Sequence, residues 1–437
     1  MTNCTYQLEL FQGYKQRKIE VNFEGGNVTS YGGVLFLRQA DRILNVSPRA
    51  AEMIQDPRRK ASCVHEIRDM LKQRVYGLCL GYEDLNDHDD VRRDAAIQTA
   101  VETDRDLASS PTLCRFESWA DRQSAFRLNA FLVEMFIESH KYPPEEIILD
   151  FDATDDPVHG NQEGREFHGY YDRYCFLPLY VFSGHHLLCA MLRKSRIDAS
   201  KHAWAVLKLL VTRLRQAWPD VQIIFRGDSG FCRHRMMDWC DRHGVGYIIG
   251  IARNKRLEAI SSRIMRKAAK LQKKTGGKVK LYTEIWYGAK TWKRKRQVIV
   301  KAEHTDKGRN NRYVVTNLPG EPRQLYEEMY CARGDMKNRI KEKQLDLFAD
   351  RTSCHKWWSN KFRLLLSSLA YVLMEAIRRL GLYGTELGNA QCGTIRLKLL
   401  KIGAIITRKT HRIRFLLSSH YPWKELFIQA AVQLNSS

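Results

Sequence analysis

The chain has 437 residues, 44% of them hydrophobic, and a formal charge of +23 with a pI near 9.6. This length suggests two or three structural units, and the charge indicates a polyanionic partner, with nucleic acid as the leading candidate. The eleven cysteines form no Cys-x-x-Cys pair, which argues against a disulfide framework and against a zinc site.

Membrane association is not expected. No apolar run reaches the roughly 18 residues that a membrane-spanning helix needs, and no basic amphipathic helix stands isolated at either end. The start, Met1 to Glu9, lacks a charged segment followed by an apolar stretch, so no secretory signal is expected. We therefore expect a cytoplasmic protein.

Residues 1–140 are expected to be mainly helical after a short opening strand, in which Ile19, Val21 and Phe23 alternate with polar neighbours. The apolar spacing predicts helices at Gly33 to Ile43, Ser62 to Gln73, Ala95 to Asp106 and Trp119 to His140. Basic clusters in this region fit two interpretations equally well, a module that binds the DNA end or a helical scaffold with solvated charges.

One acidic cluster in this region, Asp87-His88-Asp89-Asp90, invites a metal-site interpretation. A turn followed by a helix cap is favoured instead, because no second cluster of ligands has a fitting spacing.

From Glu145 the pattern changes to strands. Apolar runs predict three of them, at Ile147 to Asp152, Tyr174 to Phe182 and Leu187 to Leu192, and two hairpin-like connections would make them antiparallel. A helix from Lys201 to Trp218, which Pro219 stops, then crosses over to a fourth strand.

The fourth strand, Ile223 to Phe225, ends in Arg226-Gly227-Asp228-Ser229-Gly230-Phe231. A helix from Cys232 to His243 and a fifth strand, Gly246 to Ile251, follow it. This is the element order of a ribonuclease-H-like domain, a mixed α/β fold in which the first and fourth strands are neighbours. Asp152 and Asp228 should then lie side by side, although an acid after a strand is by itself more often a helix cap.

Residues 252–320 form a strongly basic region, with 20 Lys/Arg against 4 Asp/Glu. Strand patterns at Val279 to Trp286, Gln297 to Glu303 and Arg312 to Thr316 predict a β-rich insertion. The densest basic run, Lys293-Arg294-Lys295-Arg296, favours contact with a phosphate backbone. The alternative is a solvated β meander whose lysines protect its edges.

Helices are expected to resume after Glu321, at Leu325 to Phe348 and Lys361 to Leu380. A terminal hairpin from Ile395 to Leu399 and Arg412 to Leu417 and a closing helix at Tyr421 to Gln433 complete the chain. Five units are expected. Residues 1–140 form an N-terminal region, 145–251 and 321–380 form the two parts of the ribonuclease-H-like core, 252–320 form the basic insertion between them, and 381–437 form a C-terminal region.

Several motifs together resemble the DDE transposases of bacterial insertion sequences, most closely the thirteen-eighty insertion-sequence family. The resemblance covers nearly the whole chain. It rests on Leu149-Asp150-Phe151-Asp152-Ala153-Thr154-Asp155-Asp156, His159-Gly160-Asn161-Gln162, His168-Gly169-Tyr170-Tyr171, Arg226-Gly227-Asp228-Ser229-Gly230-Phe231, Tyr330-Cys331-Ala332-Arg333-Gly334 and Leu347-Phe348-Ala349-Asp350-Arg351-Thr352-Ser353.

The resemblance implies that Asp152 and Asp228 are the first two metal-binding acids. Asp150 lies on the same strand face and could replace Asp152 or support it, but Asp152 is favoured because Asp152-Ala153-Thr154 resembles the family's pattern better. Two Mg²⁺ or Mn²⁺ ions would be expected, since hard divalent cations prefer carboxylate oxygens. The implied reaction is phosphodiester cleavage at terminal inverted repeats and strand transfer into target DNA. Cutting two ends together implies a homodimer, associated with the bacterial nucleoid.

The third acid of this family lies in a Tyr-x2-Arg-x3-Glu-x6-Lys signature, which maps onto Tyr330, Arg333, Lys337 and Gln344. A lysine thus stands where the glutamate is expected, and its ammonium would repel metal ions. Glu342 is the nearest replacement, although five residues place it about 140° around a helix.

By the same resemblance, Tyr330 and Arg333 are expected to hold DNA phosphates, with Lys341 close enough to contribute. The sequence therefore predicts a DNA transposase in which Lys337 impairs catalysis. One alternative is a non-catalytic, DNA-binding remnant that occupies the element ends. Another is a general nuclease of the same fold, which would cut without preference for terminal repeats.

Overall fold

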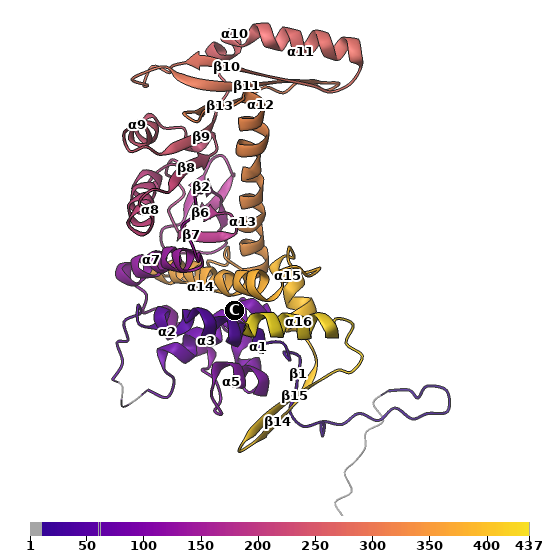
Figure 1. Ribbon diagram of the computed structural model, residues 1–437. Helices are drawn as coiled ribbons and strands as arrows, with labels where there is room; N and C mark the ends of the chain where they lie inside the picture. The colour runs from indigo at the N-terminus through magenta and orange to yellow at the C-terminus, as the bar shows by residue number, and fades with distance from the viewer. Residues whose placement is uncertain (1–10, 60, 62, 437) are drawn as a thin grey trace, which may run out of the picture.

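A nine-stranded mixed β-sheet runs through the centre of the molecule (Figure 1), in a computed structural model that describes residues 11–59, 61 and 63–436. Its strand order is β10-β11-β13-β9-β8-β2-β6-β7, with the short β12 paired to β11. The strands are β2 (Glu146–Ala153), β6 (Leu179–Ser183), β7 (His186–Met191), β8 (Gln222–Gly227), β9 (Gly246–Ile251), β10 (Val279–Tyr287), β11 (Arg296–Thr305), β12 (Gly308–Arg309) and β13 (Arg312–Thr316).

The middle of the sheet has the predicted ribonuclease-H-like order. β2, β6 and β7 are antiparallel neighbours, while β8 pairs parallel to β2 and β9 pairs parallel to β8. Helices α8 (Ala203–Ala217) and α9 (His234–Arg242) cover one face of these strands (Figure 1). The mixed α/β fold class is confirmed. The core strands read as continuous apolar runs because helices bury both faces of the sheet.

The second predicted strand is divided in two. Its first part, β5 (Arg173–Phe176), pairs with β3 (Asp156–Pro157) and β4 (Glu166–His168) in a separate small sheet, whereas its second part is β6. Pro178 lies between the two parts. Proline has no N–H to donate to a ladder, so the chain leaves one sheet and enters the other at this point.

The basic region 252–320 differs from the predicted insertion in two ways. Its strands β10, β11 and β13 continue the central sheet, since β13 pairs antiparallel with β9. Two helices that were not predicted, α10 (Lys255–Ile260) and α11 (Ser262–Thr275), precede these strands, and α11 packs on β10 and β11. The many lysines and arginines of α11 hide its few apolar positions from a pattern search.

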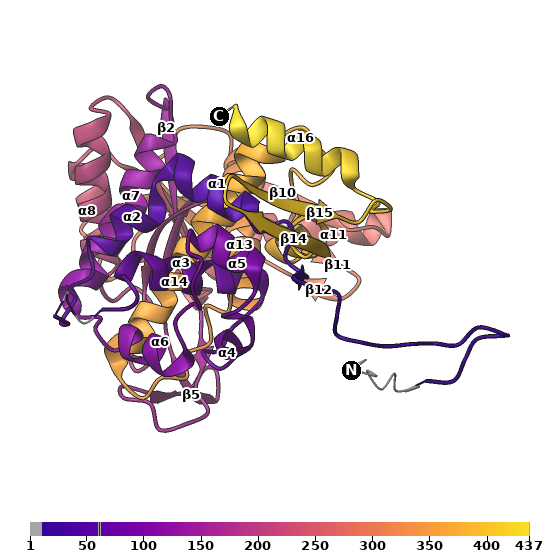
Figure 2. The same cartoon turned by 90° about the horizontal axis from the view of Figure 1, so that it is seen from below.

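The remaining helices form a body beside the β7 edge of the sheet, in which α7 and α14 both contact β7 and α14 also contacts α3 (Figures 1 and 2). All four predicted N-terminal helices are present, although three are shorter than predicted. The N-terminal helices are α1 (Leu35–Leu44), α2 (Val46–Ala51), α3 (Ile67–Leu80), α4 (Asp87–Val91), α5 (Ala95–Val101), α6 (Ser110–Glu117) and α7 (Arg122–Glu138). The later elements are α14 (Trp357–Ala376) with its extension Ile377–Gly381, α15 (Cys392–Ile395), the segment Arg396–Leu400, β14 (Ala404–Lys409), β15 (Arg412–Leu417) and α16 (Lys424–Asn435).

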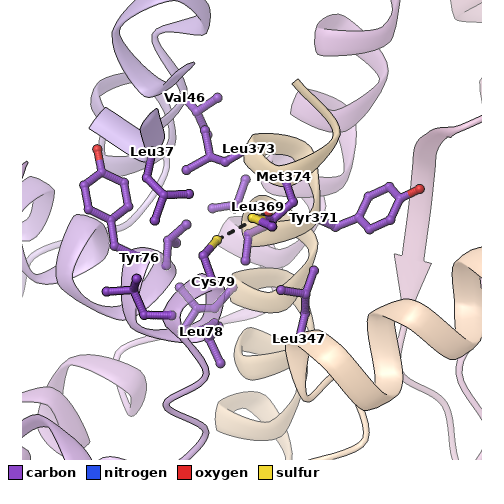
Figure 3. Packing of buried hydrophobic residues seen from close by; sticks show 14 of the residues in the cluster. Leu37, Val46, Tyr76, Leu78, Cys79, Leu347, Leu369, Tyr371, Leu373 and Met374 are labelled. Carbon is purple, nitrogen blue, oxygen red and sulfur yellow. Dashed lines mark hydrogen bonds between the residues drawn. The ribbon is translucent and has the colours of Figure 1, made fainter. Parts of the chain in front are cut away.

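The core of this body joins distant parts of the chain. Leu37, Tyr76 and Leu78 from the N-terminal helices meet Leu369 and Leu373 of α14 (Figure 3). Each of these five side chains is at most 3% exposed, and burying a leucine of this kind stabilises the fold by roughly 2 kcal/mol. The N-terminal and C-terminal regions therefore fold as one unit.

Two strand predictions outside the sheet core are wrong. Residues 19–23 form no strand, and Phe23 is 100% exposed; the first strand is instead β1 (Val28–Thr29), which pairs with β14. Residues 395–399 are helical, and the hairpin that was predicted there is made by β14 and β15. Arg396 explains the second difference, because its guanidinium donates to the carbonyl oxygens of Leu78 and Cys79 in α3.

Met1 to Glu9, where no secretory signal was expected, lie outside the described residues. Within the described ranges, no helix has both the length and the apolar character required to cross a membrane.

The acidic cluster at 87–90 lies inside a short helix, α4, whose N-cap position is Asn86, so the cluster is not the turn and cap that were favoured; His88 is fully buried in this helix. Arg74 donates from Nη1 to His88 Nε2 at 2.8 Å, because a guanidinium has no acceptor. Burial and the Arg74 charge hold the pKa of His88 well below its usual 6.5. The histidine is therefore a neutral acceptor in the core.

Acid should destabilise the fold through His88. The folded state binds fewer protons there than the unfolded state, so this contribution is complete above pH 6.5 and decreases as the pH falls. We expect a loss of about 1 kcal/mol in the free energy of unfolding at pH 5.5. His88→Gln keeps an acceptor and should flatten this part of the pH profile in urea unfolding experiments, whereas exposed His411→Gln should not. Parallel profiles for His88→Gln and the parent would contradict this role.

Candidate active site

Asp152 and Asp228 lie next to each other at the ends of two neighbouring strands, β2 and β8. The parallel register of β2 and β8 pairs Phe151 with Gly227, which makes the aspartates the next residues on the two strands. Asp152 is 7% exposed. Asp228 is half-buried, and its Oδ1 accepts from the Gly230 N–H at 2.8 Å, so it also caps the short turn after β8. Asp228 thus caps this turn and also lies next to Asp152 across the two strands.

Arg226 and Asp150 support the two aspartates. They are cross-strand partners on β8 and β2, two residues before Asp228 and Asp152. The guanidinium holds the Asp150 carboxylate through two hydrogen bonds, one of 2.7 Å from Nη2 to Oδ2. Its Nη1 donates to the Met329 carbonyl oxygen. Burial raises the pKa of Asp150 in spite of this partner. Asp150 is therefore engaged with Arg226 and supports the strand ends.

A long helical column packs beside the sheet (Figure 1) and carries the signature residues. It comprises α12 (Pro322–Gln324), a π-helical segment (Leu325–Tyr330), a short 3₁₀ turn (Cys331–Arg333) and α13 (Gly334–Leu347). Such π segments interrupt helices frequently at functional sites. A Cβ added to Gly250 of β9 would lie 2.6 Å from the Tyr330 hydroxyl and 3.1 Å from the Ser229 nitrogen. The glycine therefore gives Tyr330 room beside the turn that Asp228 caps.

Two cations of the column face the aspartates. Arg333 Nη1 lies 3.5 Å from Asp152 Oδ1, and the charges of Arg333 and Lys337 both lower the pKa of Asp152. Burial and the neighbouring Asp228 outweigh them and raise that pKa to about 6. Arg333 and Lys337 are thus brought together with Asp152 and Asp228 at one place.

The donor set does not fit two divalent ions. No group of three or more His, Cys, Asp or Glu side chains in the described part of the chain could hold a metal ion. Two carboxylates meet here, and the third position of the signature carries the Lys337 ammonium. A cation in that place adds repulsion of about 4 kcal/mol per unit charge at 4 Å and an effective dielectric of 20.

A family model described as "Transposase DDE domain group 1" matches residues 11–437. This chain belongs to the DDE transposases. No curated protein matches it. Among solved structures, a cryo-EM structure of the piggyBac transposase synaptic complex with hairpin DNA aligns with 84% of this chain and 79% of its own, at 11% identity and a TM-score of 0.44.

Glu342, the predicted substitute for the missing acid of this transposase, is not placed with the aspartates. It is 3% exposed and accepts hydrogen bonds from Arg378, from Arg339 at 2.8 Å and from the Cys392 N–H at 2.6 Å. The reason is the helical phase, since five residues turn it away from the face that carries Lys337. Glu342 therefore joins α13 to the C-terminal helices.

The last signature position, Gln344, lies farther along the same face of α13. Its Nε2 donates to Asp156 Oδ1 at 2.9 Å. Burial raises the pKa of Asp156 to about 8 and lowers the pKa of the neighbouring Lys343 to about 7. Lys343 is fully buried over the Tyr180 ring, whereas Lys341 is exposed. Of these two lysines, Lys341 alone is accessible to a phosphate.

The basic run at 293–296 is only partly accessible. Lys293, Arg294 and Lys295 are exposed between β10 and β11, with Arg294 2.7 Å from Asp241. Arg296 is 3% exposed and is held by Asp238, Asp241 and the Tyr247 hydroxyl. Arg296 is thus a buried part of the core and cannot contact a backbone phosphate.

Sequence reasoning missed three contributors to this site, namely Arg226, Gly250 and Tyr171. Tyr171 belongs to the His168-Gly169-Tyr170-Tyr171 motif, and burial together with the Asp155 and Asp152 carboxylates raises its pKa to about 12. The pairing of Arg226 with Asp150, 76 residues apart, could have been predicted from the sequence. Parallel pairing of their two strands places these residues opposite each other. The space over Gly250 depends on the position of the column and has no sequence signal.

Removal of the Arg226 charge should destabilise the transposase strongly. Arg226→Met leaves the buried Asp150 without its partner, so we expect a loss of about 3–5 kcal/mol in the free energy of unfolding. The exposed pair Arg233–Asp198 provides a matched control, and Arg233→Met should cost less than about 1 kcal/mol. Chemical denaturation at pH 7 measures both. Equal losses would show that burial of the Arg226 pair is unimportant.

Proposed function

We propose that the chain is a DNA transposase of the insertion-sequence type, most similar to the thirteen-eighty family, whose phosphodiester chemistry is impaired at Lys337. One observation carries the proposal: Asp152 and Asp228 end neighbouring strands directly opposite a helix that presents Arg333 and Lys337. Membership of the DDE transposases supports it. The substrate would be the terminal inverted repeats of an element and, for strand transfer, target DNA.

Each residue has a proposed role in this site. Asp152 and Asp228 are the carboxylates around which the reacting phosphate would be positioned. Arg333 and Tyr330 contact DNA phosphates beside them, with the planar guanidinium of Arg333 suited to two phosphate oxygens. Lys337 also attracts phosphate, but its charge opposes the divalent ions that members of this enzyme class generally use.

The partners follow from charge and from the reaction. A net charge of +23 favours double-stranded DNA, and such an interaction weakens as salt rises. Joint cutting of two element ends requires two copies of the site, so we propose a homodimer in the working complex. The corresponding location is the nucleoid of a bacterial cytoplasm.

A second function is favoured by the lysine itself. With DNA-contacting residues retained and the third acid replaced, the protein would bind element ends without cutting them. This end-occupying protein would compete with an intact transposase for the same DNA. The two candidates differ in one measurable quantity, the metal-dependent cleavage of an end duplex.

Restoration of the acid should restore cleavage. Lys337→Glu replaces a repelling charge with an attracting one, and even 3 kcal/mol of the resulting gain corresponds to more than about 100-fold in rate. The measurement is Mg²⁺- or Mn²⁺-dependent nicking of a duplex that carries the DNA flanking the coding region. We expect little cleavage by the parent and at least a 100-fold increase in the variant.

Two controls make this test specific. Asn338→Glu adds an acid at the neighbouring exposed position and should not activate cleavage, whereas Asp228→Asn in the Lys337→Glu background should abolish it. Efficient cutting by the parent would contradict impairment at Lys337. Inactivity of Lys337→Glu, with end binding intact, would favour the end-occupying function.

A further inference from the structure

The helix α11 (Ser262–Thr275) carries a continuous basic stripe at the far end of the molecule from α14 (Figure 1). Its six cations recur at intervals of three and four residues, which places them within about 120° of one another around the helix. All six are exposed: Arg263, Arg266, Lys267, Lys270, Lys273 and Lys274. We call these six residues the α11 stripe.

The opposite side of α11 is committed to packing. Ala268 is 1% exposed, and Ile264 and Met265 pack against the sheet core. The apolar residues therefore face β10 and β11, to which α11 is packed. A helix with its apolar face covered cannot insert into a lipid surface. Its outward face offers charge alone, which fits a polyanion.

Nothing on the described protein surface neutralises the stripe. None of its six cations forms a salt bridge with a described residue, and α11 contains no acid. Two lysines that follow α11 in the chain differ, because Lys278, just before β10, lies 2.5 Å from Glu303, and Lys280 in β10 lies 3.1 Å from Glu327. Six like charges at helical neighbour spacing repel one another, and an external polyanion would relieve this repulsion.

The geometry of the stripe matches duplex DNA. Eleven residues separate Arg263 from Lys274, which is about 16 Å along a helix. Duplex DNA presents one phosphate per about 1.7 Å of its axis, or roughly ten phosphates over this length. An α-helix lying along the backbone can therefore meet several phosphates at once, without reading bases.

We propose that the α11 stripe is a second DNA-binding surface, remote from the paired aspartates, that holds the phosphate backbone of duplex DNA without regard to sequence and without metal. This inference deepens the proposed transposase function. It assigns to the exposed face of α11 a contact that the sequence placed at 293–296, where Arg296 is buried.

The test measures binding of a random-sequence 40-base-pair duplex in the absence of divalent ions. Each phosphate contact contributes about 0.9 to the slope of log K against log salt, so Lys267→Gln/Lys270→Gln/Lys274→Gln should reduce that slope by about 2.7. At 0.15 M salt this corresponds to an affinity loss of roughly 100-fold. Glutamine keeps helix propensity, and thermal unfolding checks that the fold is intact.

A charge-matched control separates the stripe from net charge. Lys141→Gln/Lys208→Gln/Lys424→Gln removes three exposed lysines from other elements and should change the slope by less than 1. Equal slopes for the parent and the α11 variant, or equal losses in the α11 variant and the control, would overturn the proposal. Because the probe lacks element ends and no cleavage is measured, its result is independent of the test at Lys337.

Discussion

The buried ion pair between Arg226 and Asp150 is the interaction on which the candidate site depends. It connects three pieces of the chain that are far apart in sequence, since the guanidinium joins β8 to β2 and also holds the Met329 carbonyl of the π-helical segment. Two isolated charges would be costly at this depth, but here each is paired and hydrogen-bonded. The strand ends and the helical column are thereby fixed relative to each other.

This arrangement explains how the active-site geometry is reached from a simple fold. The parallel pairing of β2 with β8 places Asp152 beside Asp228 by register alone. The helical column must then hold Arg333 in a fixed position relative to the two aspartates. The hydrogen bond from Arg226 to the π-helical segment of the column provides that constraint. Preorganised charges of this kind need no rearrangement when a charged substrate binds.

The sequence predicts the adjacency of the aspartates because strand order follows from a few topological rules. It also predicts that Arg333, Lys337 and Gln344 share one face, since helix geometry is regular. It could not place Arg296, because a basic residue in a basic run gives no sign of the three partners that bury it. Its failure at α11 has another cause, since the few apolar residues of this helix, Ile264, Met265 and Ala268, stand among six lysines and arginines in a region whose strand patterns dominate.

At position 337, the residue that favours a stable site without metal differs from the residue that metal-dependent catalysis would need. With lysine there, two cations face two carboxylates, and the site is close to neutral without any ion. With a glutamate, three carboxylates would meet one arginine, and the burial that already raises the pKa of Asp152 to about 6 would raise it further unless a metal ion were present. Lysine therefore lowers the electrostatic cost of holding the Asp152 and Asp228 carboxylates close together in the protein without a metal ion.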